Sequence, residues 1–155
     1  MKWLLASTVA AFVVFGAVAP ASDAQEPLQP FPYLMVQQAS SATFDGKTLT
    51  LRGVGTTVWF SSRPQRRAGH MATEAYLADW QPGGSFAGDP PNAALAIPES
   101  EETIIVTLNT AKAVGSGAFA YDVTVVSGTL PEAIENLVLF VDPAGSGDPG
   151  NGAHQ

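Results

Sequence analysis

The sequence predicts a mainly β protein, built as a single antiparallel β-sandwich or partly closed barrel of seven or eight strands with one short helix. Apolar and polar residues alternate with a period of two in several segments, of which residues 119–126 are the clearest. Turns rich in glycine, proline and aspartate separate these segments. Short strands at such spacing favour a sandwich or a barrel over a parallel sheet.

The first 24 residues have the layout of a secretory signal peptide. Lys2 precedes an uncharged, largely apolar run over residues 3–19, and small residues follow up to Ala24. We predict cleavage after Ala24, a mature chain that starts at Gln25, and export to the periplasm or the extracellular space. The alternative is an uncleaved membrane anchor, but the run is shorter than the ~20 residues of a usual spanning helix.

The mature chain divides into three segments by composition. Residues 25–32 contain three prolines and predict an extended leader. Residues 33–141 are expected to form the β domain. Residues 142–155 are rich in glycine, proline and aspartate without apolar periodicity, which predicts a disordered tail.

Each strand is expected where apolar residues alternate with polar ones or form a short apolar run. A hairpin is predicted over residues 42–51, with Asp45-Gly46 at its turn and with Leu49 and Leu51 on one face. The remaining strands are predicted at residues 33–38, 56–61, 93–97, 103–109, 119–126 and 137–141.

One helix is predicted over residues 74–80. Thr73 is the expected N-cap, and Glu74 lies near the positive end of the helix dipole. Tyr76, Leu77 and Trp80 share one face, which we expect to pack on the sheet.

Composition excludes several classes of protein. The chain has seven basic and 14 acidic residues, and without Lys2 and Asp23 of the signal peptide six and 13 remain. This acidic balance argues against binding to nucleic acid or to an anionic membrane surface. The chain has no cysteine, which excludes disulfides, thiol catalysis and cysteine-ligated metal centres. We expect a monomer with no cofactor and no membrane span after signal cleavage.

The densest basic cluster supplies the favoured functional hypothesis. Arg63, Arg66 and Arg67 fall within five positions, and His70 follows closely. Guanidinium groups bind carboxylate, sulfate or phosphate through two parallel hydrogen bonds. We therefore predict an exported, non-enzymatic β protein whose 63–70 loop binds an anionic ligand or protein partner through these four residues. The alternative is that the arginines pair internally with acidic residues and hold a long loop against the sheet.

A second hypothesis is an envelope metal-handling protein of the copper type. His70 with Met71 or Glu74, and with Met35 as a further donor, supplies nitrogen, sulfur and oxygen ligands. The spacing of these residues matches no zinc motif, so no metal ligand is assigned.

A small hydrolase or lyase is the third hypothesis, because a β-sandwich can carry many activities. Residues 83–88 resemble a nucleophile elbow around Ser85, but Ala87 stands where the G-x-S-x-G pattern requires glycine. No catalytic residue is assigned.

Aromatic residues offer a platform for a carbohydrate or hydrophobic ligand. If Val58 and Phe60 face inward, alternation puts Trp59 on the opposite face. The alternative is that the helix packs there and buries Trp59. The candidate platform consists of Trp59, Phe60, Tyr76, Trp80 and Phe86.

One sequence pattern resembles a known group of proteins. The pattern is Phe60-Ser61-x-Arg63-Pro64-x-Arg66-x-x-Gly69-His70-Met71, followed by Phe86 and by Asp89-Pro90-Pro91-Asn92-Ala93. It resembles a group of small, secreted, largely uncharacterised bacterial β-rich proteins. The resemblance covers most of residues 33–141 and implies no activity.

Overall fold

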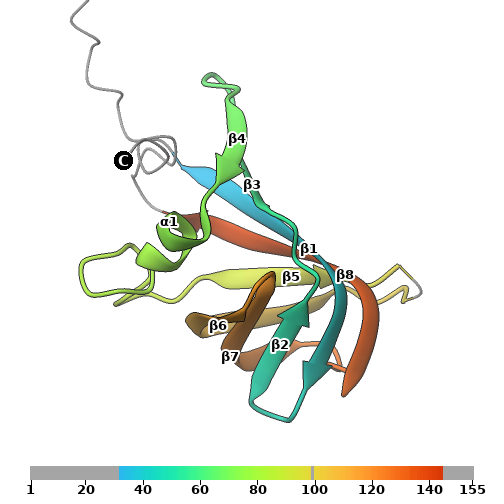
Figure 1. Cartoon of the computed structure of the whole chain (residues 1–155). Coiled ribbons are helices and arrows are strands. Elements are labelled where there is room, and N and C mark those ends of the chain that lie inside the picture. The colour runs from blue at the N-terminus through green and yellow to red at the C-terminus, as the bar shows by residue number, and fades with distance from the viewer. Residues whose placement is uncertain (1–31, 99, 145–155) are drawn as a thin grey trace, which may run out of the picture.

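Eight antiparallel strands and one short helix make up the part of the chain that the computed structural model describes, residues 32–98 and 100–144 (Figure 1). The predicted signal peptide, the leader up to residue 31 and the tail beyond residue 144 lie outside the described residues. The elements are β1 (Tyr33–Phe44), β2 (Thr48–Arg52), β3 (Thr57–Ser61), β4 (Ala68–Met71), α1 (Thr73–Ala78), β5 (Asn92–Ala96), β6 (Ile104–Gly115), β7 (Ala118–Ser127) and β8 (Ala133–Ala144).

Strand β1 organises the sheet because it pairs with three other strands. Its whole length lies against β8, while on the other edge residues 33–37 pair with β3 and residues 41–44 pair with β2. The other neighbours run β2–β7–β6–β5–β8, so the pairing of β2 with β1 closes a ring of six strands. The β3–β4 hairpin extends from this ring (Figure 1). The predicted mainly β, antiparallel fold is confirmed, and ring closure makes a partly closed barrel the better description.

Alternation along the strands decides which side chains fill the ring. Leu49 and Leu51 of β2 are fully buried, as the hairpin pattern predicts, while the residues between and beside them are not. Burial of each large apolar side chain contributes roughly 1.5–3 kcal/mol relative to exposure. The fully buried apolar side chains also include Met35, Leu95, Ile104, Val106, Leu108, Leu137, Leu139 and Val141.

The turn between β1 and β2 follows from its Asp-Gly pair. Asp45 Oδ1 accepts hydrogen bonds from the backbone N–H groups of Lys47 (2.9 Å) and Thr48 (2.6 Å). Gly46 has a φ of +95°, which side-chain-bearing residues rarely adopt. The predicted hairpin is therefore confirmed. The backbone hydrogen bonds from Thr48 and Lys47 hold the pKa of the Asp45 carboxyl below its usual value.

Helix α1 differs from the prediction at both ends. Thr73 is its first helical residue rather than its N-cap, and the N-cap is Ala72, whose side chain makes no capping hydrogen bond. The helix ends at Ala78 instead of residue 80. After it, the N–H groups of Trp80 and Gln81 bond to carbonyls three residues back, which tightens the chain into turns. No helix in residues 32–98 or 100–144 is long and apolar enough to cross a membrane.

The inner face of α1 closes one side of the core, as predicted. Tyr76 is fully buried, and Leu77 and Trp80 are half-buried against the core. The Trp80 indole Nε1 donates a hydrogen bond of 3.0 Å to the Leu108 carbonyl of β6. This hydrogen bond attaches the segment after the helix to the six-strand ring of the sheet.

Several strands differ from the sequence prediction. Strand β1 (Tyr33–Phe44) joins the strand predicted at residues 33–38 to the first strand of the predicted hairpin. Strand β8 continues to Ala144, so the β domain ends three residues later than expected. Strand β6 runs to Gly115 because it pairs with β7 over nearly its whole length. Strand β4 was not predicted, since its four residues include Gly69 and His70, and it exists through pairing with β3.

Candidate functional site

The predicted arginine site lies at the tip of the β3–β4 hairpin, in residues 62–67. The Ser61 N–H donates to the Arg67 carbonyl (2.8 Å), and the Arg67 N–H donates to Ser61 Oγ (2.9 Å). The Arg66 N–H donates to the Ser62 carbonyl (3.1 Å), and Arg66 has a positive φ of 48°. The Arg63–Pro64 peptide bond is cis. The hydrogen bonds among Ser61, Ser62, Arg66 and Arg67 make the tip a defined turn. The turn is shorter than the predicted 63–70 loop because residues 68–71 form β4.

The arginines of the tip differ in their surroundings. Arg63 and Arg66 are exposed, and neither forms an ion pair with a carboxylate of the described residues. Arg67 is half-buried, with its guanidinium carbon 5.9 Å from the centre of the Trp59 ring. This distance is typical of a cation–π contact. Internal pairing with carboxylates is therefore not what holds Arg63 and Arg66 in the part of the chain that the structure describes.

Trp59 supports the hairpin from its inner face. It is only 4% exposed and packs edge-on against Tyr33 at 6.1 Å between ring centres. A Cβ atom on Gly69, its cross-strand neighbour in β4, would lie 3.0 Å from the indole, so a larger residue would require the ring to shift by a few tenths of an ångström. The sequence assumption that Val58 and Phe60 face inward is wrong. Trp59 is the inward residue, and Phe60 is 43% exposed.

His70 does not converge with the other proposed metal donors. It is exposed on the outer face of β4, whereas Met71, the next residue, is buried on the inner face. Met35 is fully buried in β1, and Glu74 is exposed on α1. Among the described residues no group of three or more His, Cys, Asp or Glu side chains is placed to hold a metal ion. Strand alternation is the reason, because adjacent residues point to opposite faces.

The predicted aromatic platform is divided between two environments. Tyr76, Trp80 and Phe86 pack against one another in the core, with ring centres 5.1 Å and 4.7 Å apart. Phe60 points outward and Trp59 inward, so these five rings form no common surface.

Ser85 has a structural contact. Its Oγ donates a hydrogen bond of 2.8 Å to Asp79 Oδ1, just after α1. A Cβ on Gly84 would clash with the Ala78 carbonyl oxygen, so glycine lets the chain pass close to the helix end. Burial raises the pKa of the Asp79 carboxyl, and the hydrogen bonds from Ser85 oppose this shift.

A row of apolar residues crosses the outer face of the sheet beside the hairpin. Phe140 in this row is 38% exposed, and Phe60 lies on the same face two residues farther along β3 than Val58, opposite Leu34. A continuous apolar run such as residues 33–36 is typical of a strand with apolar residues on both faces. The sequence therefore contained a signal for this row, although alternation alone did not indicate it. We call this the outer apolar row, and its members in register order are Val58, Val36, Phe140, Ala94 and Ile105.

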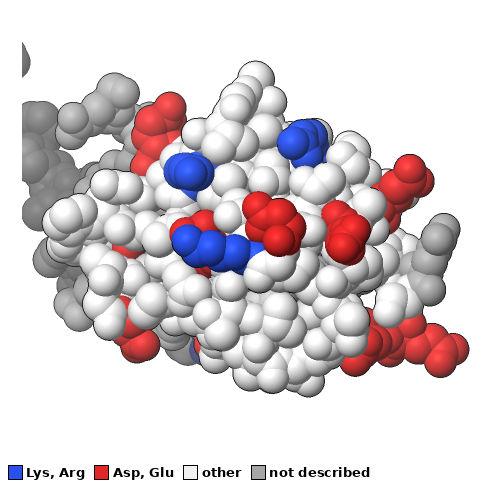
Figure 2. All heavy atoms as spheres, turned by 90° about the horizontal axis from the view of Figure 1, so that it is seen from below, with Lys and Arg blue, Asp and Glu red and all other residues white. Residues whose placement is uncertain are grey.

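Charges elsewhere on the surface are sparse and mixed. Figure 2 shows basic side chains interspersed with acidic ones on a largely uncharged face. One pair joins Lys47 Nζ to Asp122 Oδ2 at 3.6 Å.

A series of hydrogen-bonded, buried polar side chains runs through the core, and no sequence pattern had indicated it. We call this series the buried polar chain. Gln37 is fully buried, its Nε2 donates to Thr57 Oγ1 (2.9 Å), and its Oε1 accepts from the Tyr121 hydroxyl (2.7 Å). The Tyr121 and Tyr76 hydroxyls are 2.9 Å apart. Because Tyr121 has one proton and gives it to Gln37, Tyr76 must donate to Tyr121. Desolvation by burial raises the pKa of both tyrosines, which keeps both hydroxyls protonated.

A comparison with known proteins finds no protein family, no curated protein and no solved structure that matches this chain. The resemblance to a group of secreted bacterial proteins therefore stays an expectation from the sequence.

Proposed function

We propose that this protein is an exported, non-enzymatic binding protein that holds an acidic polypeptide at the tip of the β3–β4 hairpin. One observation carries the proposal: Arg63 and Arg66 are exposed without a carboxylate partner among the described residues. The whole chain has 14 acidic residues for seven basic ones. Since no carboxylate of residues 32–98 or 100–144 neutralises these two guanidinium groups, their charge stays available to a ligand.

Packing of Arg67 on Trp59 supports the proposal by ordering the tip. The ring limits the conformations of this guanidinium, so less side-chain entropy is lost when a ligand binds. Two hydrogen bonds between Ser61 and Arg67, one between backbone groups and one from the Arg67 N–H to Ser61 Oγ, also restrict the conformation of the tip.

The apolar surroundings favour a polypeptide over a free inorganic anion. Phe60 and the outer apolar row adjoin the arginine tip, and His70 stands at the end of that row opposite Val58. Exposed aromatic residues beside arginine are typical of protein interfaces. An acidic segment with apolar side chains would engage the tip through its carboxylates and the outer face through its apolar groups. Export is proposed from the signal-peptide pattern of residues 1–24.

The test is binding of fluorescently labelled polyglutamate, measured by anisotropy at low and physiological salt. The double variant Arg63→Ala/Arg66→Ala should raise Kd at least about tenfold, because each hydrogen bond between charged groups contributes ~1.5–3 kcal/mol. Binding should also become less sensitive to salt. Arg67 is left in place because its loss would disturb Trp59.

A charge-matched control separates the tip from general electrostatic attraction. The variant Arg52→Ala/Lys112→Ala also removes two exposed positive charges, from β2 and β6. Its Kd should change little, and an equal loss in both variants would contradict a site at the tip. No binding of polyglutamate by the wild type, with tight binding of heparin or polyphosphate, would replace the polypeptide with a sulfated or phosphorylated ligand.

A further inference from the structure

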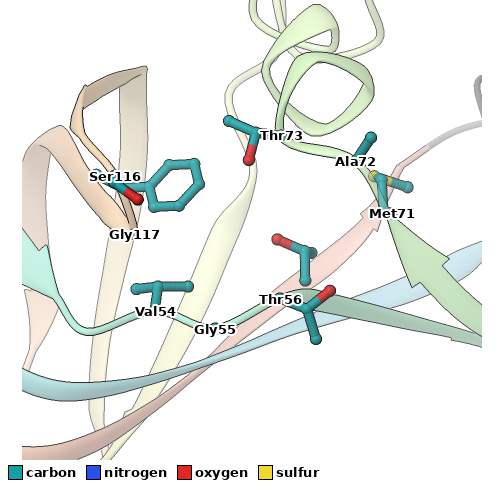
Figure 3. Close-up of a pocket in the computed structure, with 10 residues that line it drawn as sticks. Val54, Gly55, Thr56, Met71, Ala72, Thr73, Ser116 and Gly117 are labelled. Atoms are coloured by element: carbon teal, nitrogen blue, oxygen red, sulfur yellow. The ribbon is translucent and has the colours of Figure 1, made fainter.

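A pocket of about 380 Å³ lies at the base of the β3–β4 hairpin, at the opposite end from the arginine tip (Figure 3). Three segments distant in sequence line it: residues 54–57, residues 71–73 and residues 116–119. The Val54 N–H donates to the Gly117 carbonyl (2.9 Å), which joins the first and third segments. Its volume lies within the usual range of small-molecule sites.

The lining of the pocket has an apolar floor, a hydroxyl-bearing rim and no charged residue. Val54, Met71 and Phe119 are buried and supply the apolar part. Thr56, Thr73 and Ser116 are exposed and supply hydroxyls at the rim. In Figure 3 the Thr73 side chain points from the start of α1 into this space.

Thr57 connects the pocket to the buried polar chain. Its side chain is 3% exposed, and its Oγ1 already accepts a hydrogen bond from Gln37. Gln37 donates to Thr57, and Tyr121 donates to Gln37. Because Tyr121 has a single hydroxyl proton, the remaining contact requires Tyr76 to donate to Tyr121. No acceptor for the Thr57 hydroxyl proton lies among the described residues, and Thr57 lines the pocket, so a pocket occupant can accept this proton.

We propose that this pocket binds a neutral sugar, either free or as the terminal residue of a glycan, with Thr57 donating to a sugar oxygen. Rim hydroxyls both donate and accept, which matches the hydroxyls of a sugar, and the absence of charge disfavours anions and cations. The proposal is independent of the acidic partner at the hairpin tip.

The test is saturation-transfer NMR on the purified protein with glucose, galactose, mannose and N-acetylglucosamine, and with their methyl glycosides. We expect transfer to at least one sugar and a Kd about tenfold weaker for Thr57→Val, since one hydrogen bond is removed. Transfer to a methyl glycoside indicates a glycan terminus, and transfer to the free sugar alone indicates a monosaccharide. No transfer to any member of the panel would overturn the proposal.

Two further variants keep the test informative if Thr57→Val destabilises the core. Thr57→Ser retains the hydroxyl and should keep the wild-type Kd, while Thr73→Phe fills the mouth from an exposed position and should abolish binding. Binding that persists in Thr73→Phe would show that the sugar lies elsewhere. Arg63→Ala/Arg66→Ala should bind the sugar like the wild type, so the two proposals fail separately.

Discussion

Gln37 shows how a single polar residue is accommodated inside the ring. Its amide is fully buried, yet both ends have partners: Thr57 accepts from Nε2, and Tyr121 donates to Oε1. A buried amide without partners would destabilise the fold, whereas a satisfied one specifies how the surrounding strands pack. The polar chain therefore links β1, β3, β7 and α1 by direction-dependent contacts.

Two tyrosine variants test this polar chain. Tyr121→Phe leaves Gln37 Oε1 and the Tyr76 hydroxyl without partners in the core, so the free energy of unfolding should fall by about 1–3 kcal/mol. Tyr76→Phe removes only the first donor and leaves the Tyr121–Gln37 bond, so the loss should be smaller, ~0.5–1.5 kcal/mol. Urea unfolding of both variants measures the difference. Equal losses, or a greater loss for Tyr76→Phe, would contradict the assigned donor order.

At the scale of elements, α1 depends on its surroundings rather than on its own sequence. It has six residues and no side-chain N-cap, and so short a helix is not stable alone. The buried Tyr76 and the Trp80–Leu108 hydrogen bond attach the segment to the ring. Just after the helix, the partly buried Asp79 carboxyl accepts from Ser85 Oγ.

The pKa of Asp79 gives a pH-dependent prediction for this element. Burial raises it in the folded state, so the folded protein holds the proton more tightly than the unfolded chain. The charged Asp79 carboxylate therefore destabilises the folded state at neutral pH. This destabilisation decreases as the pH falls through the raised pKa, because the carboxyl becomes protonated. Asp79→Asn removes the charge and keeps an oxygen acceptor for Ser85, so its Tm should exceed that of the wild type at pH 7. The difference should shrink at acidic pH.

The matched control is Asp89→Asn, which removes the same charge from an exposed position. Scanning calorimetry at a series of pH values should show little change for it. A lower Tm for Asp79→Asn than for the wild type at pH 7 would mean that the charged carboxylate stabilises the turn after α1.

At the scale of the whole molecule, ring closure replaces the covalent cross-links that many exported proteins use. The chain has no cysteine, and the pairing of β2 with β1 joins the two ends of the six-strand series. β4 keeps an unpaired edge among the described strands, and it is short and bears an exposed His70. A short strand with polar groups limits edge-to-edge association, and the monomer stays a prediction from the sequence.

Processing of the chain is the prediction at this scale. Cleavage after Ala24 would leave every described element in place, because the first strand starts at Tyr33. Protein isolated from its own source should start at Gln25 and give a β-dominated circular dichroism spectrum that does not change with reductant. An intact Met1 in the membrane fraction would refute export.

Local patterns in the sequence were sufficient for the mainly β class, the Asp45-Gly46 turn and the helix face with Tyr76. Such features depend on neighbouring residues, since a turn needs a positive φ and a strand shows a period of two. The arginine cluster was also visible, because residues 63–67 are close in the chain. These are the parts of the fold and of the candidate site that could be predicted.

Tertiary structure alone decided which face of each strand is buried and which distant segments meet. Alternation defines two faces of β3 but not which of them is buried, and in the folded protein Trp59 is buried beside Gly69 while Phe60 is exposed. β4 exists because β3 pairs with it, and the pocket exists because residues 54–57, 71–73 and 116–119 come together. The physical reason is that packing and pairing energies depend on contacts between residues far apart in the chain, which local propensity does not encode.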